Sequence, residues 1–430
     1  MTENLRTRLA GKELKVFLFF SLLVFLVAAF ATGTPKNILQ GMTTIILSRD
    51  ALITDYFELA GFGASFLNAA LVLGIGLILL FSQKSAFTGI TMAALFINAG
   101  YALWGKNPLN IWPMILGTAL YARLHHAGLG RYIYTALFGT SLAPLITEMG
   151  FLLPFGPVVN WLISVALGIF IGFVMPPLSM HTASMHMGYN LFNVGFSAGI
   201  LAFALVCILR SFGMESESVL IWKTGREPFL ILGLFLYFLI TFLYGFFLNH
   251  GRLKELFRIT RHPGRAVADF VLMDGPGPTL MNMALVGMVC LSYILLIGGD
   301  LSGPVVGAIL TAFGFAAFGV HVKNYLPVLA GVLLATLCNR FTCLTPGIQL
   351  AAIFAVGLAP VAGQFGIFSG ILAGALHSVI VMCTAGMYGG MNLYNNGFSA
   401  GWTAILLIPI LESFMKRFPT RKRRKKNHDS

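Results

Sequence analysis

Charged residues are scarce in this sequence, and their scarcity excludes most soluble folds. Only 10% of the 430 residues are Asp, Glu, Lys or Arg, whereas a soluble domain usually carries about a quarter. Hydrophobic residues make up 57% of the chain. Most of the chain must therefore contact lipid or other apolar helices instead of water.

Motifs for nucleotide binding and for common enzyme chemistry are also missing. The sequence has no phosphate-binding Gly-Lys-Ser/Thr loop, no dinucleotide fingerprint, no nucleophile elbow and no His-Glu-x-x-His. Its five cysteines lie in apolar surroundings without the spacing of metal ligands. We expect that the protein is not an enzyme and uses no cofactor and no metal. Any energy for its activity would then come from a solute or ion gradient.

Several hydrophobic runs approach or reach the length of about 20 residues that a helix needs to cross a bilayer. These runs are residues 16–31, 62–81, 132–153, 158–174 and 229–248. Lipid offers no hydrogen-bond partners, so a crossing segment must satisfy its own backbone, and the alternating strands of a barrel are absent from the sequence. The predicted fold class is therefore all-α.

Basic residues are concentrated at the C-terminal end of the chain. The net charge is +13, and eight Lys or Arg residues lie within 416–426, directly after an apolar run. Such a tail is first a topology signal and a contact for anionic lipids. We expect a basic cytoplasmic tail at 416–430 and no nucleic-acid partner. A tail that docks a protein or a nucleic acid is the alternative.

A twelve-residue box occurs twice in the chain. Residues 188–199 read GYNLFNVGFSAG and residues 390–401 read GMNLYNNGFSAG, so nine of the twelve positions are identical at a separation of 202. Upstream the separation is 214, with the matching pairs Asp55/Asp269, Asn68/Asn282, Gly105/Gly319, Pro113/Pro327 and Gly117/Gly331. We infer a first membrane repeat at 1–213 and a second at 214–415.

The same register bears on the first hydrophobic run. Basic residues followed by the apolar run 16–31 resemble a secretory signal peptide. The register of 214, however, places this run opposite residues 230–245 of the second repeat. We therefore expect the run to belong to the fold and to be retained.

Loop charges favour two repeats of opposite orientation. Both tails are basic, so both termini are expected in the cytoplasm of a cell whose inner membrane holds this multi-pass chain. Residues 33–60 hold two Lys or Arg and the equivalent residues 249–274 hold five, a difference that inverted repeats require. Seven crossings per half, about 14 in all, fit this topology; about 10 to 12 crossings with re-entrant segments are the alternative.

Asparagines in the two boxes are the first candidates for a solute site. Asn190 and Asn193, and their equivalents Asn392 and Asn395, are three apart and would lie on one face of a helical turn. An amide in hydrocarbon is costly unless it is paired, so such residues often mark a site. The alternative is that the asparagines cap helices and the neighbouring glycines pack them.

Two further pairs of equivalent residues point to the same region. Asn68 and Asn282 lie within apolar segments and could project amides into the same cavity, or bond to a neighbouring helix. Pro113 and Pro327 interrupt short hydrophobic segments, the feature that marks broken helices at transporter sites. We predict a site between the repeats, near the middle of the bilayer.

Ionisable residues inside the predicted membrane region are few. Glu148 is the one carboxylate deep within an apolar run, and His181, His186 and His377 lie close to the boxes. Each is a candidate for proton coupling. The alternatives are a helix-end hydrogen bond for the glutamate and loop histidines without function.

The boxes, together with GKNPLNIWPMILG at 105–117, resemble a bacterial integral-membrane family that is catalogued only as a domain of unknown function. This resemblance covers nearly the whole chain and implies no substrate. The element Gly188-Tyr189-Asn190 is similar to a repeated element of urea transporters, whose halves are also inverted, and it adds Tyr189 to the candidate site. The second copy has Met391 in place of the tyrosine.

The sequence therefore predicts a transporter or channel for a small polar solute, because the candidate cavity offers amides and backbone dipoles but little fixed charge. One alternative is a membrane-embedded enzyme acting on a lipid-linked substrate, with His181, His186 and Glu148 as acid and base groups. Another is a membrane scaffold that transports nothing. A homo-oligomer is compatible with each of these functions.

Overall fold

The structure is a computed structural model, and it describes residues 3–50, 53–216, 219–388 and 390–417. The described residues form helices joined by turns and loops, with two isolated β-bridges. The all-α fold class is confirmed. Of the basic tail expected at 416–430, residues 416 and 417 end the last helix, and 418–430 lie outside the described residues, so the lipid contact stays a prediction.

The two halves of the chain have the same order of helices. The first half contains α1 (Glu3–Thr32), α2 (Pro35–Leu47), α3 (Tyr56–Ala60), α4 (Phe62–Ser82), α5 (Gly89–Tyr101), α6 (Trp112–Leu124), α7 (Ile133–Gly139), α8 (Ala143–Leu152), α9 (Pro157–Met185) and α10 (Asn193–Ser211). The second half contains α11 (Pro228–Leu248), α12 (Lys254–Ile259), α13 (Phe270–Asp274), α14 (Pro276–Ile297), α15 (Gly303–Phe315), α16 (Val322–Thr336), α17 (Pro346–Phe354), α18 (Ala359–Phe365), α19 (Ile367–Thr384) and α20 (Asn395–Arg417).

Among the described residues, ten helical segments are long and apolar enough to cross a membrane, five in each half. The chain is therefore a polytopic membrane protein, and the lower of the two predicted crossing counts agrees with the structure. Two of the seven crossings expected in the first half, at about 86–104 and a short one near 109–122, correspond to α5 and α6. These helices have 13 residues each, about 20 Å against the roughly 30 Å of hydrocarbon, so each is too short to cross alone. A loop at 102–111 separates them.

Helix breaks occur at equivalent places in the two halves. The segment Leu129–Leu152 is interrupted by a 3-10 turn at Thr140–Leu142, and Pro346–Phe365 by a 3-10 turn at Ala355–Leu358. A proline follows each break, at the second position of α8 and of α18, where proline disfavours a continuous helix through the preceding residue. The break expected at Pro113 is wrong, because this proline lies in the first turn of α6.

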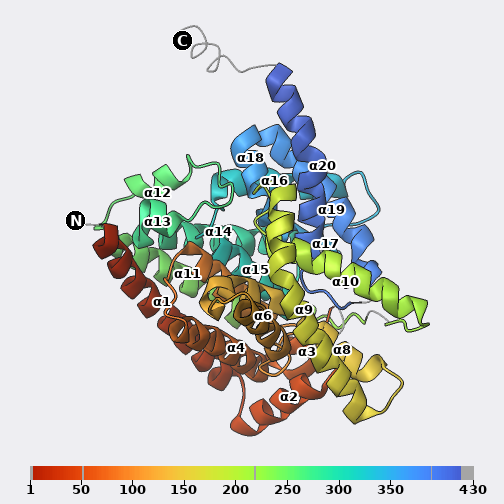
Figure 1. Cartoon of the computed structure of the whole chain (residues 1–430). Helices are drawn as coiled ribbons and strands as arrows, with labels where there is room; N and C mark the ends of the chain where they lie inside the picture. The colour runs from red at the N-terminus through yellow and green to blue at the C-terminus, as the bar shows by residue number, and fades with distance from the viewer. Residues whose placement is uncertain (1–2, 51–52, 217–218, 389, 418–430) are drawn as a thin grey trace.

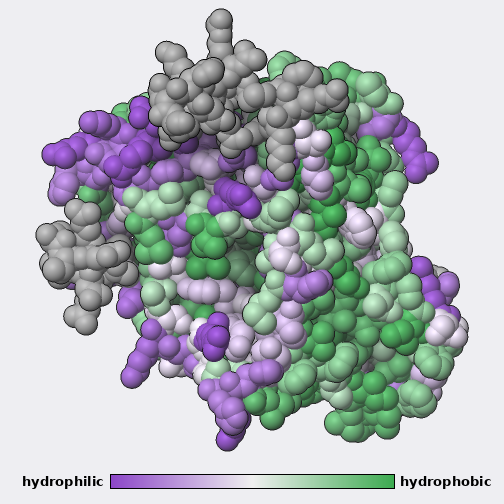
Figure 2. Space-filling model, turned by 45° about the horizontal axis from the view of Figure 1, so that its top comes forward, coloured by the Kyte–Doolittle hydropathy of each residue, from purple (hydrophilic) through white to green (hydrophobic). Residues whose placement is uncertain are grey.

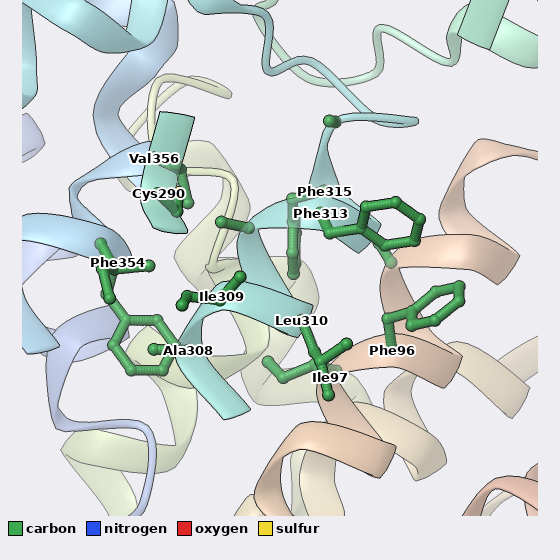
Figure 3. Close-up of a cluster of buried hydrophobic side chains, with 14 of the residues drawn as sticks. Phe96, Ile97, Cys290, Ala308, Ile309, Leu310, Phe313, Phe315, Phe354 and Val356 are labelled. Atoms are coloured by element: carbon green, nitrogen blue, oxygen red, sulfur yellow. The ribbon is translucent and has the colours of Figure 1, made fainter. Parts of the chain in front are cut away.

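The short helices α5 and α15 pack against each other at the centre of the molecule. Phe96 of α5 and Phe313 of α15 meet edge to face with ring centroids 4.8 Å apart, within the buried apolar cluster of Figure 3. Both helices are almost wholly buried. Their central place explains how helices too short to cross a bilayer alone are held inside the protein.

Each half caps a helix of the other half. The Asp55 carboxylate accepts a hydrogen bond from the backbone N–H of Gly303, the first residue of α15, at 3.0 Å. The Asp269 carboxylate accepts one from Gly89, the first residue of α5, at 2.9 Å. Carboxylates satisfy the free N–H groups at a helix start. The two halves therefore share a reciprocal interface.

The ends of the molecule differ in composition from its middle. Figure 1 shows α12 and α13 toward one end, at the top of the view, and α2 at the opposite end. Figure 2 shows hydrophobic residues over a broad area on the right, and hydrophilic residues gathered at upper and lower left. A wide apolar surface of this kind suits contact with lipid.

Candidate functional site

Two cavities lie at equivalent places in the two halves. We call them the small cavity and the large cavity. Among the described residues that line the small cavity are Ile53, Trp104, Leu350, Val381, Met382, Ala385, Leu393, Asn395 and Asn396. Their repeat equivalents Val267, Phe318, Tyr134, Ser179, Met180, Ala183, Leu191, Asn193 and Val194 line the large cavity. Each cavity therefore takes residues from both halves, with the contributions of the two halves exchanged.

The two cavities differ greatly in size. The large cavity has a volume of about 500 Å³ and the small cavity about 50 Å³. Exposure at equivalent positions follows the same difference, since Val267 is 83% exposed and Ile53 only 8%. We call the large cavity open and the small cavity, which has about a tenth of its volume, closed.

The linker between the halves packs against the closed cavity. Ile221 donates its N–H to the carbonyl of Ile53 at 2.8 Å, and its own carbonyl accepts from the N–H of Asp55 at 3.1 Å. The backbone N–H of Lys223 also bonds to the Asp55 carboxylate, at 3.0 Å. The linker at 219–225 thus covers a wall of the small cavity.

Asn193 and Asn395, one in each box, make equivalent contacts. Asn193 donates to the carbonyl of Ser179 at 2.9 Å, and its side-chain oxygen accepts from Thr182 at 2.9 Å. Asn395 donates to the carbonyl of Val381, and its oxygen accepts from Thr384. Each asparagine lines its cavity and also fixes the start of α10 or α20 to the preceding long helix.

Asn190 and Asn392 form turns ahead of the helices α10 and α20. The oxygen of Asn190 accepts from the N–H of Phe192, and the oxygen of Asn392 from the N–H of Tyr394, both at 2.9 Å. The predicted shared helical face with Asn193 and Asn395 is wrong, because the side chain of each leading asparagine holds a turn outside the helix. Asn190 lines the large cavity.

His186 lines the large cavity, and its tautomer follows from its partner. Asn193 uses its amide N–H on Ser179, so its oxygen must accept the 2.8 Å hydrogen bond from His186 Nε2. Burial lowers the pKa of His186, which favours the neutral ring. Its Nδ1 therefore carries a lone pair, for which the described part of the chain supplies no hydrogen-bond partner.

Asn68 and Asn282 join helices to loops. Asn68 donates to the carbonyls of Ala102 and Lys106 at 2.6 and 2.7 Å. Asn282 donates to the equivalent carbonyls of Ala316 and Val320, both at 2.8 Å. Both amides hold the turn that follows α5 or α15. Contact of either one with a solute stays a prediction.

Other predicted site residues lie apart from one another. The buried Tyr189 ring packs 4.7 Å from the Arg265 guanidinium. His181 is exposed on α9, whereas His377 is buried in α19 and pairs with Ser399 at 3.0 Å. The carboxylate of Glu148 is paired with Arg49 and also accepts from Ser216 at 2.7 Å. Glu148 therefore lies beside the start of the linker, and a proton-coupling role for any of these groups stays a prediction.

Two buried charged residues were not among the site residues predicted from the sequence. Asp50 is 0% exposed and accepts from Tyr56, Asn110 and Thr147. Lys106, 1% exposed, donates to Asn98 and Thr140 at 2.8 Å. A comparison of the two repeats distinguishes both residues, because their equivalents in the second repeat are the uncharged Gly264 and Val320.

Comparison with known families places the chain in one family. A family model described as a protein of unknown function, DUF1576, matches residues 34–211 and 248–413. The chain belongs to this family. No curated protein and no solved structure matches it significantly.

Proposed function

We propose that the protein is a transporter for a small polar solute, and that its two repeats lie in opposite orientations in an inner membrane with both termini in the cytoplasm. The observation that carries this proposal is the pair of equivalent cavities, one of about 500 Å³ and one of about 50 Å³. Inverted repeats that exchange their conformations expose a central site first on one side and then on the other. A structure with one cavity open and its counterpart closed fits one state of such a cycle.

The lining of the large cavity favours a solute that can donate a hydrogen bond. His186, Asn190 and Asn193 bring polar side chains to this lining, and His186 Nδ1 is buried without a hydrogen-bond partner among the described residues. Aromatic and aliphatic side chains make up most of the remaining wall, including Phe138, Phe192 and Phe315. Such a wall suits an uncharged molecule with N–H or O–H groups, bound without a cofactor.

Flux through the purified protein tests this function. The full chain would be placed in liposomes, and the entry of urea, formamide, glycerol and neutral amino acids would be measured. A Val267→Cys variant places a thiol at an 83% exposed position in the large cavity. We expect flux of at least one solute, and its loss after a bulky maleimide reacts with this thiol.

The matched control is Leu296→Cys, at a position that is 86% exposed and outside the lining of the large cavity. Its modification should leave flux unchanged. Unchanged flux after complete modification of Val267→Cys would contradict the placement of the solute path. Absence of flux for every solute in the panel would count against transport of small neutral molecules.

A further inference from the structure

A polar cluster beside the small cavity occurs in one repeat and not in the other. The first repeat has Arg49, Asp50, Thr147 and Glu148 where the second has Pro263, Gly264, Gly363 and Gln364. In the second repeat backbone fills this space, since a Cβ on Gly363 would lie 2.1 Å from the carbonyl oxygen of Pro263. The cluster is therefore specific to the first repeat, which contributes Ile53 and Trp104 to the lining of the small cavity.

Asp50 ties together segments of the first repeat, including those that bring Ile53 and Trp104 to the small cavity. One carboxylate oxygen accepts from Tyr56 of α3 at 2.6 Å. The other accepts from Asn110, in the loop at 102–111, at 3.3 Å, and from Thr147 of α8 at 3.1 Å. Trp104, which lines the cavity, lies in the same loop as Asn110, and Ile53, which also lines it, lies three residues before Tyr56. Separating the segments would break these bonds and admit water to the carboxyl.

Other charged groups near Asp50 already have partners. Glu148 of α8 is paired with Arg49 and bonded to Ser216. Lys106, in the same loop as Asn110, directs its ammonium group to Asn98 and Thr140. Burial raises the pKa of the Asp50 carboxyl to about 7 and the charge of Glu148 adds to this effect, while hydrogen bonds from Tyr56, Thr147 and Asn110 oppose it.

We propose that Asp50 is a proton-binding site that controls access to the small cavity. The protonated carboxyl stays buried and the cavity stays closed, whereas loss of the proton favours opening, because a carboxylate is more stable in water than in a closed apolar site. This inference rests on the proposed transport function, for which it supplies coupling to pH. The closed form binds the proton on Asp50 more tightly than the open form does, so low pH favours the closed form.

Thiol labelling of the full chain in detergent tests the proposal without any solute. Ile53→Cys reports the small cavity and Val267→Cys, its repeat equivalent, reports the open one. Cys207, Cys338, Cys343 and Cys383 would be replaced by alanine, and the buried Cys290 would be kept. The quantity compared is the maleimide reaction rate of Ile53→Cys divided by that of Val267→Cys. The pH dependence that all thiols share cancels in this ratio. From about pH 6 to pH 8 this ratio should rise on the order of tenfold, as expected for a carboxyl that titrates near 7 when closed and near 4 when open.

The Asp50→Asn variant keeps a neutral, buried side chain, so its ratio should stay low at every pH. A ratio that does not change with pH in the parent, or an undiminished rise in Asp50→Asn, overturns the proposal. If Asp50→Asn does not fold, Thr147→Val decides the question. This variant removes one donor from the carboxylate, so the midpoint of the rise should move to higher pH; an unmoved midpoint overturns the proposal.

The two proposals fail separately. Labelling that depends on pH, together with no flux, would retain the proton site and reject transport. Flux together with labelling that ignores pH in the parent would retain transport and reject the proton site.

Discussion

Gly100 and Gly307 face each other where α5 crosses α15, so closely that a methyl group on either would lie 2.4 Å from the carbonyl oxygen of the other. We expect Gly100→Ala to destabilise the protein by about 1–3 kcal/mol, the usual cost of an added carbon in a packed core. Thermal unfolding in detergent measures this change. Gly74→Ala, in α4 with no atom near the added methyl, should be neutral or slightly stabilising; equal losses in both variants would contradict the close crossing.

Removal of the Asn282 amide should weaken the junction between α14 and the turn after α15. Asn282→Ala leaves the buried carbonyls of Ala316 and Val320 without this donor, at a cost of about 1–3 kcal/mol. Asn68→Ala should cost a similar amount, because Asn68 makes the equivalent bonds. Thermal unfolding of the two single variants checks this expectation. A loss in only one of them would show that the two junctions are not equivalent.

Stability should depend on pH through Asp50. Burial raises the pKa of its carboxyl to about 7 in the folded protein, whereas an unfolded chain has an ordinary aspartate near 4. The folded state therefore binds more protons between these values, and the free energy of unfolding falls as the pH rises from about 4 to about 7. Above pH 7 the buried, charged carboxylate lowers the free energy of unfolding by its full amount, at most about 4 kcal/mol.

Asp50→Asn should remove this dependence. The variant should unfold at a higher temperature than the parent at pH 8 and lose that advantage at pH 4. Unfolding temperatures measured across this pH range give the comparison. An advantage that is independent of pH would point to packing instead of titration.

The opposite orientation of the repeats can be tested by labelling from one side of the membrane. Single cysteines would replace Leu39 on α2 and Phe257 on α12, which are 70% and 62% exposed. An impermeant maleimide added to sealed right-side-out vesicles should react with Leu39→Cys alone if the termini are cytoplasmic. Lysed vesicles provide the control in which both thiols react. Labelling of both positions from one side contradicts inverted repeats.

Repetition in the sequence predicted the matched contacts well. Asn68 and Asn282 were paired from spacing alone, and each bonds two carbonyls that are also 214 residues apart. Hydrophobic length predicted helices, but it overestimated the crossings. The reason is that α5 and α15 are apolar because they are buried in protein, and burial in protein and exposure to lipid leave the same composition in a 13-residue segment.

Unequal cavities could not be predicted from the repeat. Ile53 and Val267 are similar residues at equivalent positions, and their different exposure depends on the linker that packs on Ile53. Asp50 is not predicted for another reason: the repeat points to residues that the two halves share, whereas this carboxyl occurs in the first half alone. Differences between repeats carry information about which half has acquired an added role.

The crossed contacts of Asp55 with Gly303 and of Asp269 with Gly89 have a consequence for the ancestry of the chain. A contact that is made once in each direction is one that two identical polypeptides can also make. A single ancestral unit, inserted in the bilayer both ways up, would already possess the matching halves of this junction. Fusion of two copies of such a gene would require a connecting segment, and it would free each copy to diverge.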